Sequence, residues 1–246
     1  MNQKWAVGVI LLAGIAGSVF IYQKTHRLQS ASEVNFTGQL KSKGLGSAKV
    51  VIVGYSDFQC PSCQAAEPIL TEFMAKYPKD IRLVFRHFPL PMHLWSSVAH
   101  QAAECAHRKG KFWEFHDKIF QTQKEWSTPA NPTDRFLEFA KGLNLNLDQF
   151  AACLTDQSVT DAVKEDRYHG DRLKVESTPT FFINGDRVVG PVELKIKGEG
   201  LIRKFLGLPP LPAPALAPST PVAVQTPTQA STPAANASSP QGTPSH

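Results

Sequence analysis

The sequence predicts an α/β domain with a large helical insertion. Two short runs, residues 49–55 and 81–88, have the β-branched or alternating composition of strands, and apolar residues at helical spacing lie between them. A helical pattern then continues from residue 91 to residue 174. A further apolar run at residues 180–183 is followed by a hairpin turn and a last helix. This order predicts one sheet covered by helices.

The first three elements form a βαβ-type unit. Residues 49–55 (KVVIVGY) are an apolar run of the kind that forms a buried strand. Residues 60–77 repeat apolar side chains at helical spacing, and Pro78 ends that helix. Residues 81–88 (IRLVFRHF) alternate apolar and polar side chains, which indicates a second strand.

The remaining elements complete the same sheet. Within the helical block of residues 91–174, glycines and prolines mark the breaks between helices. Residues 180–183 are expected to form a third strand, and the Asn-Gly-Asp at 184–186 is a strong signal for a tight turn into residues 187–189. Residues 193–206 have the pattern of a last helix.

Residues 1–28 predict a membrane anchor or a signal segment. From Trp5 to Tyr22 the chain has 18 residues without a charge, and as a helix this run spans about 27 Å, close to the roughly 30 Å of a bilayer core. No clear Ala-x-Ala site follows, which favours an uncleaved anchor over a cleaved signal peptide. Either alternative exports the remainder of the chain. Residues 29–47, polar with scattered glycines, are expected to be a tether.

Residues 207–246 are expected to be a disordered tail. Ten of the 19 prolines lie from Pro209 onward, and no Asp, Glu, Lys or Arg occurs between Phe205 and Ser245. Such a segment has too little to bury to offset the entropy of ordering it. A proline-rich ligand for a binding domain is the alternative. The compact domain is therefore expected at residues 48–206.

The composition excludes several classes of protein. With 246 residues, 42% of them hydrophobic and 19% charged, the chain has enough apolar material for one core, which excludes a wholly disordered or fibrous protein. Lys and Arg (26) exceed Asp and Glu (21) only slightly and form no basic run, so we expect no nucleic-acid partner. Four cysteines are too few for a disulfide framework, but two of them form one Cys-x-x-Cys.

Cys60 and Cys63 occupy the junction between a predicted strand and a predicted helix. Unpaired N–H groups and the dipole at a helix N-terminus stabilise negative charge. A thiolate at Cys60 is therefore favoured, and Pro61 suits the first turn because its missing N–H would have no partner. The pattern indicates a redox-active pair. A structural disulfide or half of a zinc or copper site is the alternative, although Cys105 and Cys153 are too far apart in sequence to supply a second close pair.

Four segments share their order and spacing with one known family. They are residues 56–63 (SDFQCPSC), residues 86–91 (RHFPLP), residues 102–106 (AAECA) with 110–113 (GKFW), and residues 178–185 (TPTFFING). Together they span nearly all of the expected domain. The chain resembles the DsbA-like thiol:disulfide oxidoreductases of the thioredoxin superfamily.

This resemblance implies a thioredoxin-like fold in which residues 91–174 are the helical insertion. Cys60 is then the nucleophile and Cys63 the resolving thiol. Pro179 is implied to be cis and to face the Cys60 sulfur, and Thr178 and Pro179 give the backbone contact for a substrate peptide. The implied partners are reduced or unfolded exported proteins and a quinone-coupled membrane oxidase, with no cofactor and no metal.

The chain departs from the family pattern at two places. One concerns proton transfer to the second cysteine, and the other concerns the redox potential of the pair. Many relatives carry an acid on the strand six residues before the first cysteine, but here that position is Gly54. Asp57 is the nearest carboxylate before the pair and hence the candidate for proton transfer. The dipeptide between the cysteines is Pro61-Ser62, without the histidine of strongly oxidising members, so the resemblance does not set the potential.

Cys105 and Cys153 are expected to form a structural disulfide. Each lies on an apolar helical stretch, and outside the cytoplasm such a pair is more readily bridged than free. Two separate buried thiols are the alternative.

Other side chains carry weaker signals. His100, Glu104 and His107 share one helix face, which suits a metal site but is more typical of a solvated face. His93, in the loop after Pro91, is a candidate to approach the cysteines. Four aromatic residues are expected to pack in the core rather than bind a cofactor: Phe112, Trp113, Phe115 and Phe120.

We therefore expect a membrane-tethered thiol:disulfide oxidoreductase that oxidises exported proteins on the periplasmic or cell-envelope side of a membrane. A reductase or isomerase using the same pair is the enzymatic alternative, although residues 29–47 are too short for the dimerisation module of dedicated isomerases. A metal-binding or peptide-binding module that retains the fold is the non-enzymatic alternative.

Overall fold

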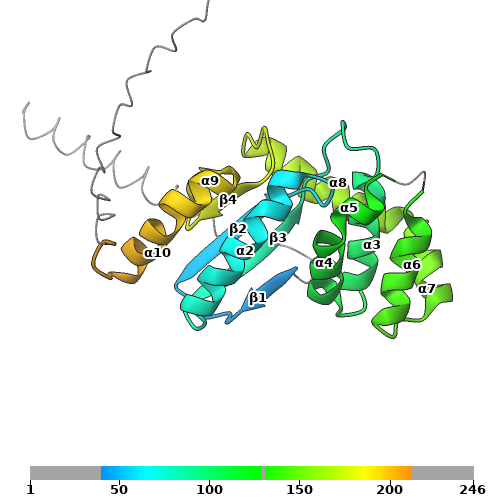
Figure 1. Ribbon diagram of the computed structural model, residues 1–246, viewed down its shortest axis with the longest axis horizontal. Coiled ribbons are helices and arrows are strands. Elements are labelled where there is room, and N and C mark those ends of the chain that lie inside the picture. The colour runs from blue at the N-terminus through cyan, green and yellow to red at the C-terminus, as the bar shows by residue number, and fades with distance from the viewer. Residues whose placement is uncertain (1–39, 129–130, 212–246) are drawn as a thin grey trace, which may run out of the picture. The chain divides into compact units, whose positions relative to one another are not determined.

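The computed structural model describes residues 40–128 and 131–211. A five-stranded mixed sheet forms its centre, in the order β1-β3-β2-β4-β5. β2 (Val50–Ser56) and β3 (Ile81–His87) are parallel, and α2 (Pro61–Lys76) connects them. Figure 1 shows α2 lying across these two strands. The predicted βαβ-type unit is therefore confirmed.

The hairpin at the other side of the sheet is also as predicted. β4 (Thr180–Ile183) pairs antiparallel with β2, and β5 (Asp186–Val189) pairs antiparallel with β4. Asn184 and Gly185 connect them, with φ of 45° and 92°. Two successive positive φ angles are what a tight two-residue hairpin turn requires, and Asn-Gly adopts them readily.

Part of the predicted tether, residues 29–47, is instead a strand of the sheet, β1 (Ser42–Gly44). This strand pairs antiparallel with β3, with Ser42 opposite Val84 and Gly44 opposite Arg82, and Lys41 just before it is buried. Ser-Lys-Gly has no β-branched or alternating apolar residues, so the strand depends on the open edge of β3 rather than on its own composition. The domain therefore includes residues before the predicted start at residue 48.

Between β3 and β4 the chain forms the predicted helical insertion. Figure 1 shows α3 to α7 gathered to one side of the sheet. The predicted core aromatics are buried, apart from Trp113, which is partly exposed. The helices of the insertion are α3 (Ser96–His107), α4 (Phe112–Gln121), α5 (Gln123–Trp126), α6 (Thr133–Gly142), α7 (Leu147–Leu154) and α8 (Gln157–Arg172).

The last helical segment begins earlier than predicted and is not regular. α9 (Gly190–Glu193), a π-helical stretch (Leu194–Gly198) and α10 (Glu199–Leu206) follow one another. Gly198 lies against α2, because a Cβ there would be 2.8 Å from the Phe73 ring. Only a residue without a side chain allows the segment to approach the helix so closely.

Successive side chains of β2 point to opposite faces of the sheet. Val50 and Ile52 pack on the α2 side, in a core that includes Phe73. Tyr55 belongs to a smaller cluster of its own. Phe58, in the turn after β2, joins the large aromatic core of the insertion. The turn that carries the first cysteine is therefore packed between the sheet and the inserted helices.

A disulfide joins two helices of the insertion. Cys105 on α3 is bonded to Cys153 on α7, at a sequence separation of 48 residues. This confirms the predicted structural bridge. A cross-link of this kind stabilises a protein mainly by restricting its unfolded chain.

Replacing Cys105 and Cys153 together with Ala should lower the free energy of unfolding by about 2–5 kcal/mol. Urea unfolding of the wild-type and double-variant proteins, both with the other two cysteines alkylated, measures the difference. Turnover at the active-site pair should be retained at temperatures where the variant stays folded. An unchanged free energy of unfolding would show that this bridge does not stabilise the fold.

Two sequence predictions lie partly or wholly outside the described residues. The predicted N-terminal anchor falls in residues 1–39, and most of the predicted tail falls in residues 212–246. Within the described ranges, none of the helices combines the length and the apolar character needed to cross a bilayer. At the start of the predicted tail, Gly207 ends α10 with a left-handed φ of 69°.

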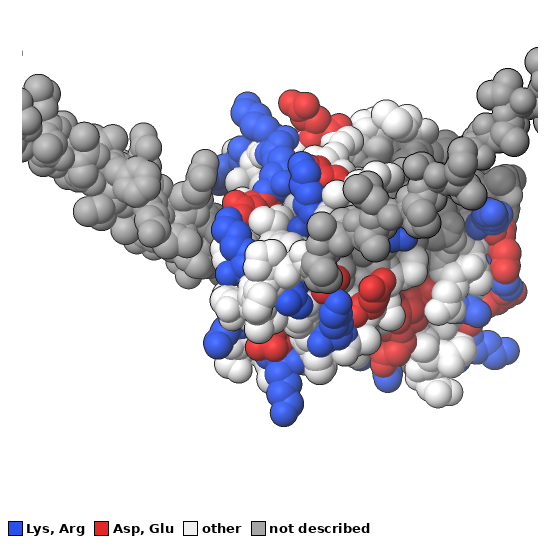
Figure 2. All heavy atoms as spheres, turned by 60° about the vertical axis from the view of Figure 1, so that its left-hand side comes forward, with Lys and Arg blue, Asp and Glu red and all other residues white. Residues whose placement is uncertain are grey.

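Charged side chains are mixed on the face shown in Figure 2, where Lys and Arg are interspersed with Asp and Glu. Among the described residues, charged side chains form ion pairs, including Lys197 with Glu193 and Lys204 with Asp186. This face therefore carries no uninterrupted basic stripe, in keeping with the absence of a basic run in the sequence.

Candidate active site

Cys60 lies at the junction of β2 and α2. In the turn between them, the Asp57 carbonyl accepts the Cys60 N–H at 3.1 Å. Cys60 is the N-cap of α2, with an extended backbone, and Pro61 is the first helical residue. The first-turn N–H groups of Ser62 and Cys63 therefore lie near the Cys60 sulfur and favour its thiolate, although the side chain forms no capping hydrogen bond with them.

The two sulfurs differ in acidity. The Cys63 thiol, together with Thr178 and the first-turn N–H groups, stabilises the Cys60 thiolate and lowers the pKa of Cys60 to about 5, against the opposing effect of burial. Burial raises the pKa of Cys63 well above its ordinary value, and the hydrogen bond with Cys60 raises it further. Cys60 is 8% exposed and Cys63 is fully buried. Cys60 is therefore the more accessible of the two sulfurs, and it is the one at which the sequence predicts a thiolate.

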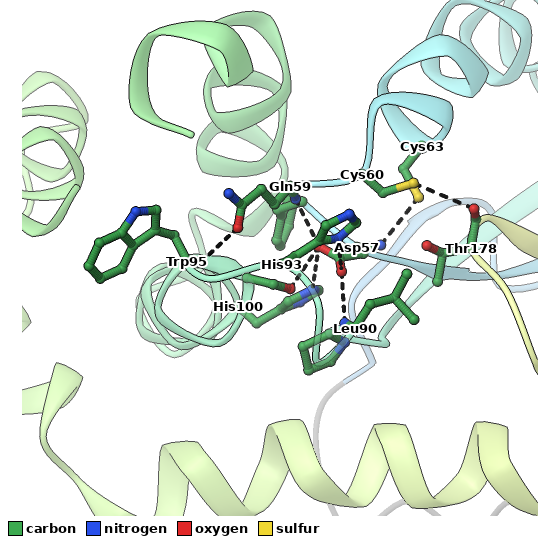
Figure 3. A network of polar contacts seen from close by, with 12 residues as sticks. Asp57, Gln59, Cys60, Cys63, Leu90, His93, Trp95, His100 and Thr178 are labelled. Atoms are coloured by element: carbon green, nitrogen blue, oxygen red, sulfur yellow. Dashed lines mark hydrogen bonds and ion pairs between the residues drawn. The ribbon is translucent and has the colours of Figure 1, made fainter. Parts of the chain in front are cut away.

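The Thr178–Pro179 peptide lies beside Cys60, just before β4. Its peptide bond is cis, as the resemblance implied. The Thr178 carbonyl oxygen is 3.5 Å from the Cys60 sulfur, and Figure 3 shows it facing the pair. The Pro179 carbonyl accepts the N–H of Gly190, which anchors this side of the site. Opposite it, the Pro61–Ser62 dipeptide is exposed.

Asp57 holds the loop after β3 against the site. Its carboxylate accepts the backbone N–H groups of Gln59 and Leu90, both at 2.8 Å. It also accepts the Ser96 hydroxyl at 2.7 Å and lies 2.8 Å from Nδ1 of His93. Figure 3 shows these partners converging on the buried carboxylate. His93 therefore approaches Asp57, not the sulfurs.

The role of Asp57 in proton transfer stays a prediction. Its contact with the pair is made by the backbone, since the Asp57 N–H lies 3.3 Å from the Cys63 sulfur. Its carboxylate is engaged with four partners around the loop. The geometry therefore gives Asp57 a structural role that the sequence alone did not indicate.

Replacing Asp57 with Ala should lower the free energy of unfolding by at least about 3 kcal/mol, because each buried donor left without an acceptor costs about 1–3 kcal/mol. Asp57→Asn keeps one carbonyl oxygen and should lose less. Urea unfolding of the two variants and the wild type measures their free energies of unfolding, which should decrease from the wild type to Asp57→Asn to Asp57→Ala. Equal stability of all three proteins would contradict the assigned role.

His100 and Glu104 are buried, which corrects the prediction of a solvated helix face. Nδ1 of His100 is 2.6 Å from Nδ1 of His87, and Glu104 lies 3.1 Å from the Lys41 ammonium. Burial lowers the pKa of both histidines well below its ordinary value. Of the three predicted residues, only His107 is partly exposed.

Arg86 and Asp166 extend this buried polar cluster. Their side chains are 2.7 Å apart, and Asp166 is also 3.1 Å from Lys41. The cluster draws its members from β3, α3, α8 and the segment before β1, so no local pattern reveals it. Across residues 40–128 and 131–211, no three His, Cys, Asp or Glu side chains are arranged to hold a metal ion.

Two features around Cys63 concern its proton. The Ser56 side chain, at the end of β2, favours the Cys63 thiolate, but this effect is outweighed by burial. At Gly54, on the same side of the strand, an added Cβ would lie 3.0 Å from the Phe181 ring. The place of the strand acid is therefore occupied by an aromatic ring of β4.

Comparison with known proteins settles the family. A sequence model of the family described as Thioredoxin matches residues 41–197, which span the chain from the start of β1 to beyond the Thr178–Pro179 peptide. The chain belongs to the thioredoxin family. Within this family its fold is that of the DsbA-like members, as the sequence predicted.

Solved structures of this thioredoxin-family fold come from several bacteria. α-DsbA1 of Wolbachia pipientis is 22% identical, with a TM-score of 0.63 over 73% of this chain and 96% of that one. Oxidised BdbD from Bacillus subtilis is 22% identical, with a TM-score of 0.60 over 68% and 93%. A thioredoxin-like oxidoreductase from Silicibacter pomeroyi DSS-3 is 24% identical, with a TM-score of 0.59 over 69% and 94%.

Curated relatives of the thioredoxin-family domain carry a different name. The Na(+)/H(+) antiporter NhaA 3 of Salinispora tropica is 37% identical over 164 residues, or 66% of this chain. The Na(+)/H(+) antiporter NhaA 1 of Salinispora arenicola is 37% identical over 166 residues, or 67% of this chain. The chain spans 24% of the length of either relative.

Proposed function

We propose that this thioredoxin-family protein is a thiol:disulfide oxidoreductase that forms disulfide bonds in exported proteins. One observation carries the proposal: an acidic, slightly exposed Cys60 lies over a buried, protonated Cys63, beside the Thr178 carbonyl. An outer thiolate and an inner thiol are the arrangement that disulfide exchange requires.

The reaction begins with the oxidised protein, in which Cys60 and Cys63 are bonded. A client thiolate attacks the Cys60 sulfur, and the bond to Cys63 breaks. Cys63 leaves with the electron pair and takes up a proton. A second client thiolate then attacks the client sulfur of the mixed disulfide and releases Cys60 as a thiolate. The client loses two electrons, and the pair gains them.

The acidity of Cys60 supports the oxidase direction. Whatever stabilises the thiolate stabilises the reduced protein, and a stable reduced form makes the disulfide a stronger oxidant. The lowering of the pKa of Cys60 to about 5 is such a stabilisation. A reductase would use the same two sulfurs but would require a reduced form that is less favoured. An isomerase would start from the same Cys60 thiolate, so the acidity of Cys60 does not distinguish it from an oxidase.

Three observations support a site of action outside the cytoplasm. Cys105 and Cys153 form a structural disulfide, and structural disulfides are rare in cytosolic proteins. A structure with this fold, at a TM-score of 0.55 and 19% identity, is described as a periplasmic thioredoxin-like protein from Salmonella enterica serovar Typhimurium. The uncharged run from Trp5 to Tyr22 supports export, as an anchor or as a cleaved signal.

Reoxidation completes the proposed cycle, and a quinone-coupled membrane oxidase is the partner proposed for it. The two electrons of the reduced pair would pass to this partner by a second disulfide exchange at Cys60. Ion antiport is not part of the proposed function, because this chain spans 24% of the length of the antiporter relatives.

The reduction potential of the pair tests the proposed direction. We expect a value well above the roughly −220 to −260 mV of a cytosolic glutathione pool. Equilibration of the full chain with glutathione redox buffers, followed by alkylation of free thiols, measures it. A potential at or below that of glutathione would indicate a reductase. A stoichiometric metal and no exchange would indicate a binding module.

A further inference from the structure

The backbone of Cys60 decides where its sulfur lies. The Cys60 N–H donates to the Asp57 carbonyl at 3.1 Å, and the Cys60 carbonyl accepts the N–H groups of Cys63 and Gln64 at 3.1 and 3.2 Å. These bonds are local to the turn and to the first turn of α2. They do not fix the turn against the inserted helices, into whose core it packs. That connection is made by side chains.

Gln123 binds two carbonyls of the turn. It is the first residue of α5, in the insertion, and it is 3% exposed. Its Nε2 donates to the Phe58 carbonyl at 2.8 Å and to the Cys60 carbonyl at 3.0 Å. Both partners are acceptors, so the nitrogen of the amide has to face them, and its two N–H groups are both used. One buried side chain of the insertion therefore bonds directly to the backbone of the nucleophile.

α5 is a firm support for this amide. Trp126, at its other end, is fully buried, and its indole Nε1 donates to the Ile119 carbonyl at 2.8 Å. Its ring lies 5.3 Å from the Phe136 ring, between centroids, in an edge-on arrangement. A group positions another precisely only when its own element is held by packing and hydrogen bonds. The short helix meets that condition.

A second glutamine joins the same turn to the insertion. Oε1 of Gln59 accepts the Trp95 N–H at 2.7 Å, a contact that Figure 3 shows, and its Nε2 donates to the Ser127 carbonyl at 3.1 Å. Ser127 directly follows α5. The turn is therefore tied to the α5 segment from two sides, and of the two amides it is that of Gln123 that bonds to Cys60 itself.

Fixing a carbonyl fixes the whole peptide group to which it belongs, because that group is planar. At Cys60 the extended backbone, with a ψ of 120°, directs the carbonyl to Gln123. The same backbone places the sulfur 3.5 Å from the Thr178 carbonyl oxygen. Rotation of the peptide group between Cys60 and Pro61 would move the sulfur relative to Thr178 and to the first turn of α2.

We propose that Gln123 is the positioning residue of the nucleophile: by binding the Phe58 and Cys60 carbonyls, it holds the Cys60 sulfur at the N-terminus of α2. Gln123 acts through the backbone and takes no part in the exchange of sulfurs. The helical insertion thereby contributes to the reactivity of a cysteine that belongs to the sheet and α2. The consequence for turnover rests on the proposed function, but not on the direction of exchange.

Replacing Gln123 with Leu removes both donors. We expect the pKa of Cys60, followed by the ultraviolet absorbance of its thiolate in the full chain, to rise by about one unit. The equilibrium constant for oxidation of glutathione should then fall about tenfold, which corresponds to about 30 mV. Gln123→Glu is the rescue variant, because its carboxyl can donate one hydrogen bond only while protonated. Its equilibrium constant should approach that of the wild type at acid pH and fall below it as pH rises.

Gln101→Leu is the matched control. Gln101 also bonds through its amide, to the Thr160 hydroxyl at 3.0 Å, and so joins α3 to α8 away from the turn. Its loss should lower stability but leave the Cys60 pKa and the glutathione equilibrium unchanged. The same result in Gln123→Leu would reduce Gln123 to a structural residue and overturn the proposal. Should Gln123→Leu fail to fold, a ratio of Gln123→Glu to wild type that does not change with pH would overturn it instead.

Failure of the proposed function gives a different result. A wild-type protein that exchanges no disulfide with glutathione or with an unfolded client would overturn the proposed function. The Cys60 pKa can still be measured in such a protein, and its rise in Gln123→Leu but not in Gln101→Leu would support the positioning role.

Discussion

The Cys63→Ser variant should accumulate client proteins as mixed disulfides at Cys60, and its turnover should be lost. The Cys60 thiolate still attacks a client disulfide, binds one client sulfur and releases the other as a thiolate. Without Cys63, nothing inside the protein can attack the new bond. The measurement is a non-reducing gel of the reduced variant after incubation with an unfolded, disulfide-containing client.

Cys60→Ser is the matched control, and it should trap almost no client. Its remaining active-site sulfur is buried and protonated, because the pKa of Cys63 is raised. Pro179→Ala, in the Cys63→Ser background, should change which complexes accumulate, since a client strand needs the backbone beside Cys60. Equal trapping by the Cys63→Ser and Cys60→Ser variants would overturn the assignment of nucleophile and resolving thiol.

At pH 7 the reduced protein should be more stable than the oxidised one, and the Cys60 thiolate should contribute about 3 kcal/mol to the reduced form. The folded protein lowers the pKa of Cys60 from 9.0 to about 5. Neutral pH lies two units above the folded value, and each unit corresponds to about 1.4 kcal/mol. The oxidised protein has no thiolate at this position and so lacks this contribution.

The stability difference should depend on pH in a defined direction. A lowered pKa stabilises the folded state fully above the unfolded value, near pH 9, and the gain is lost as pH falls through about 5. Cys63 has the opposite shift, so its resistance to ionisation lowers the stability of the reduced protein above about pH 9. The difference between the two forms should therefore widen from pH 5 to pH 9.

Urea unfolding of both redox forms at several pH values within this window measures the difference. The Cys105→Ala/Cys153→Ala protein is the appropriate background, because reduction then changes only the active-site pair. An oxidised form that is more stable throughout the window would contradict both the low pKa of Cys60 and the oxidase direction.

Most of the fold can be predicted from the sequence because local pattern and tertiary packing agree. β2, α2 and β3 begin and end within about a residue or two of the limits that periodicity sets. β1 could not be predicted, since Ser42–Gly44 becomes a strand only by pairing with β3. The π-helical stretch Leu194–Gly198 is likewise set by a tertiary contact, between Gly198 and Phe73.

The candidate site likewise contains residues that the sequence predicts and residues that only the fold reveals. Cys60 and Cys63 are evident from their spacing, and the cis peptide before Pro179 follows from the family resemblance. Periodicity places His100 on one face of a helix but does not say what covers that face, so its burial was missed. The sequence does not single out Ser56 either, because only the fold places it where it acts on the Cys63 thiol.

The close approach of Phe181 to Gly54 constrains how this sequence can change over evolutionary time. A carboxylate at position 54 requires a Cβ, which would lie 3.0 Å from the aromatic ring. The two positions are therefore coupled: a side chain at position 54 requires either a shift of the Phe181 ring by a few tenths of an ångström or a smaller residue in its place. A smaller residue would leave a void in the core and cost stability. Glycine is thus the residue that leaves this packing undisturbed, which favours its retention at position 54.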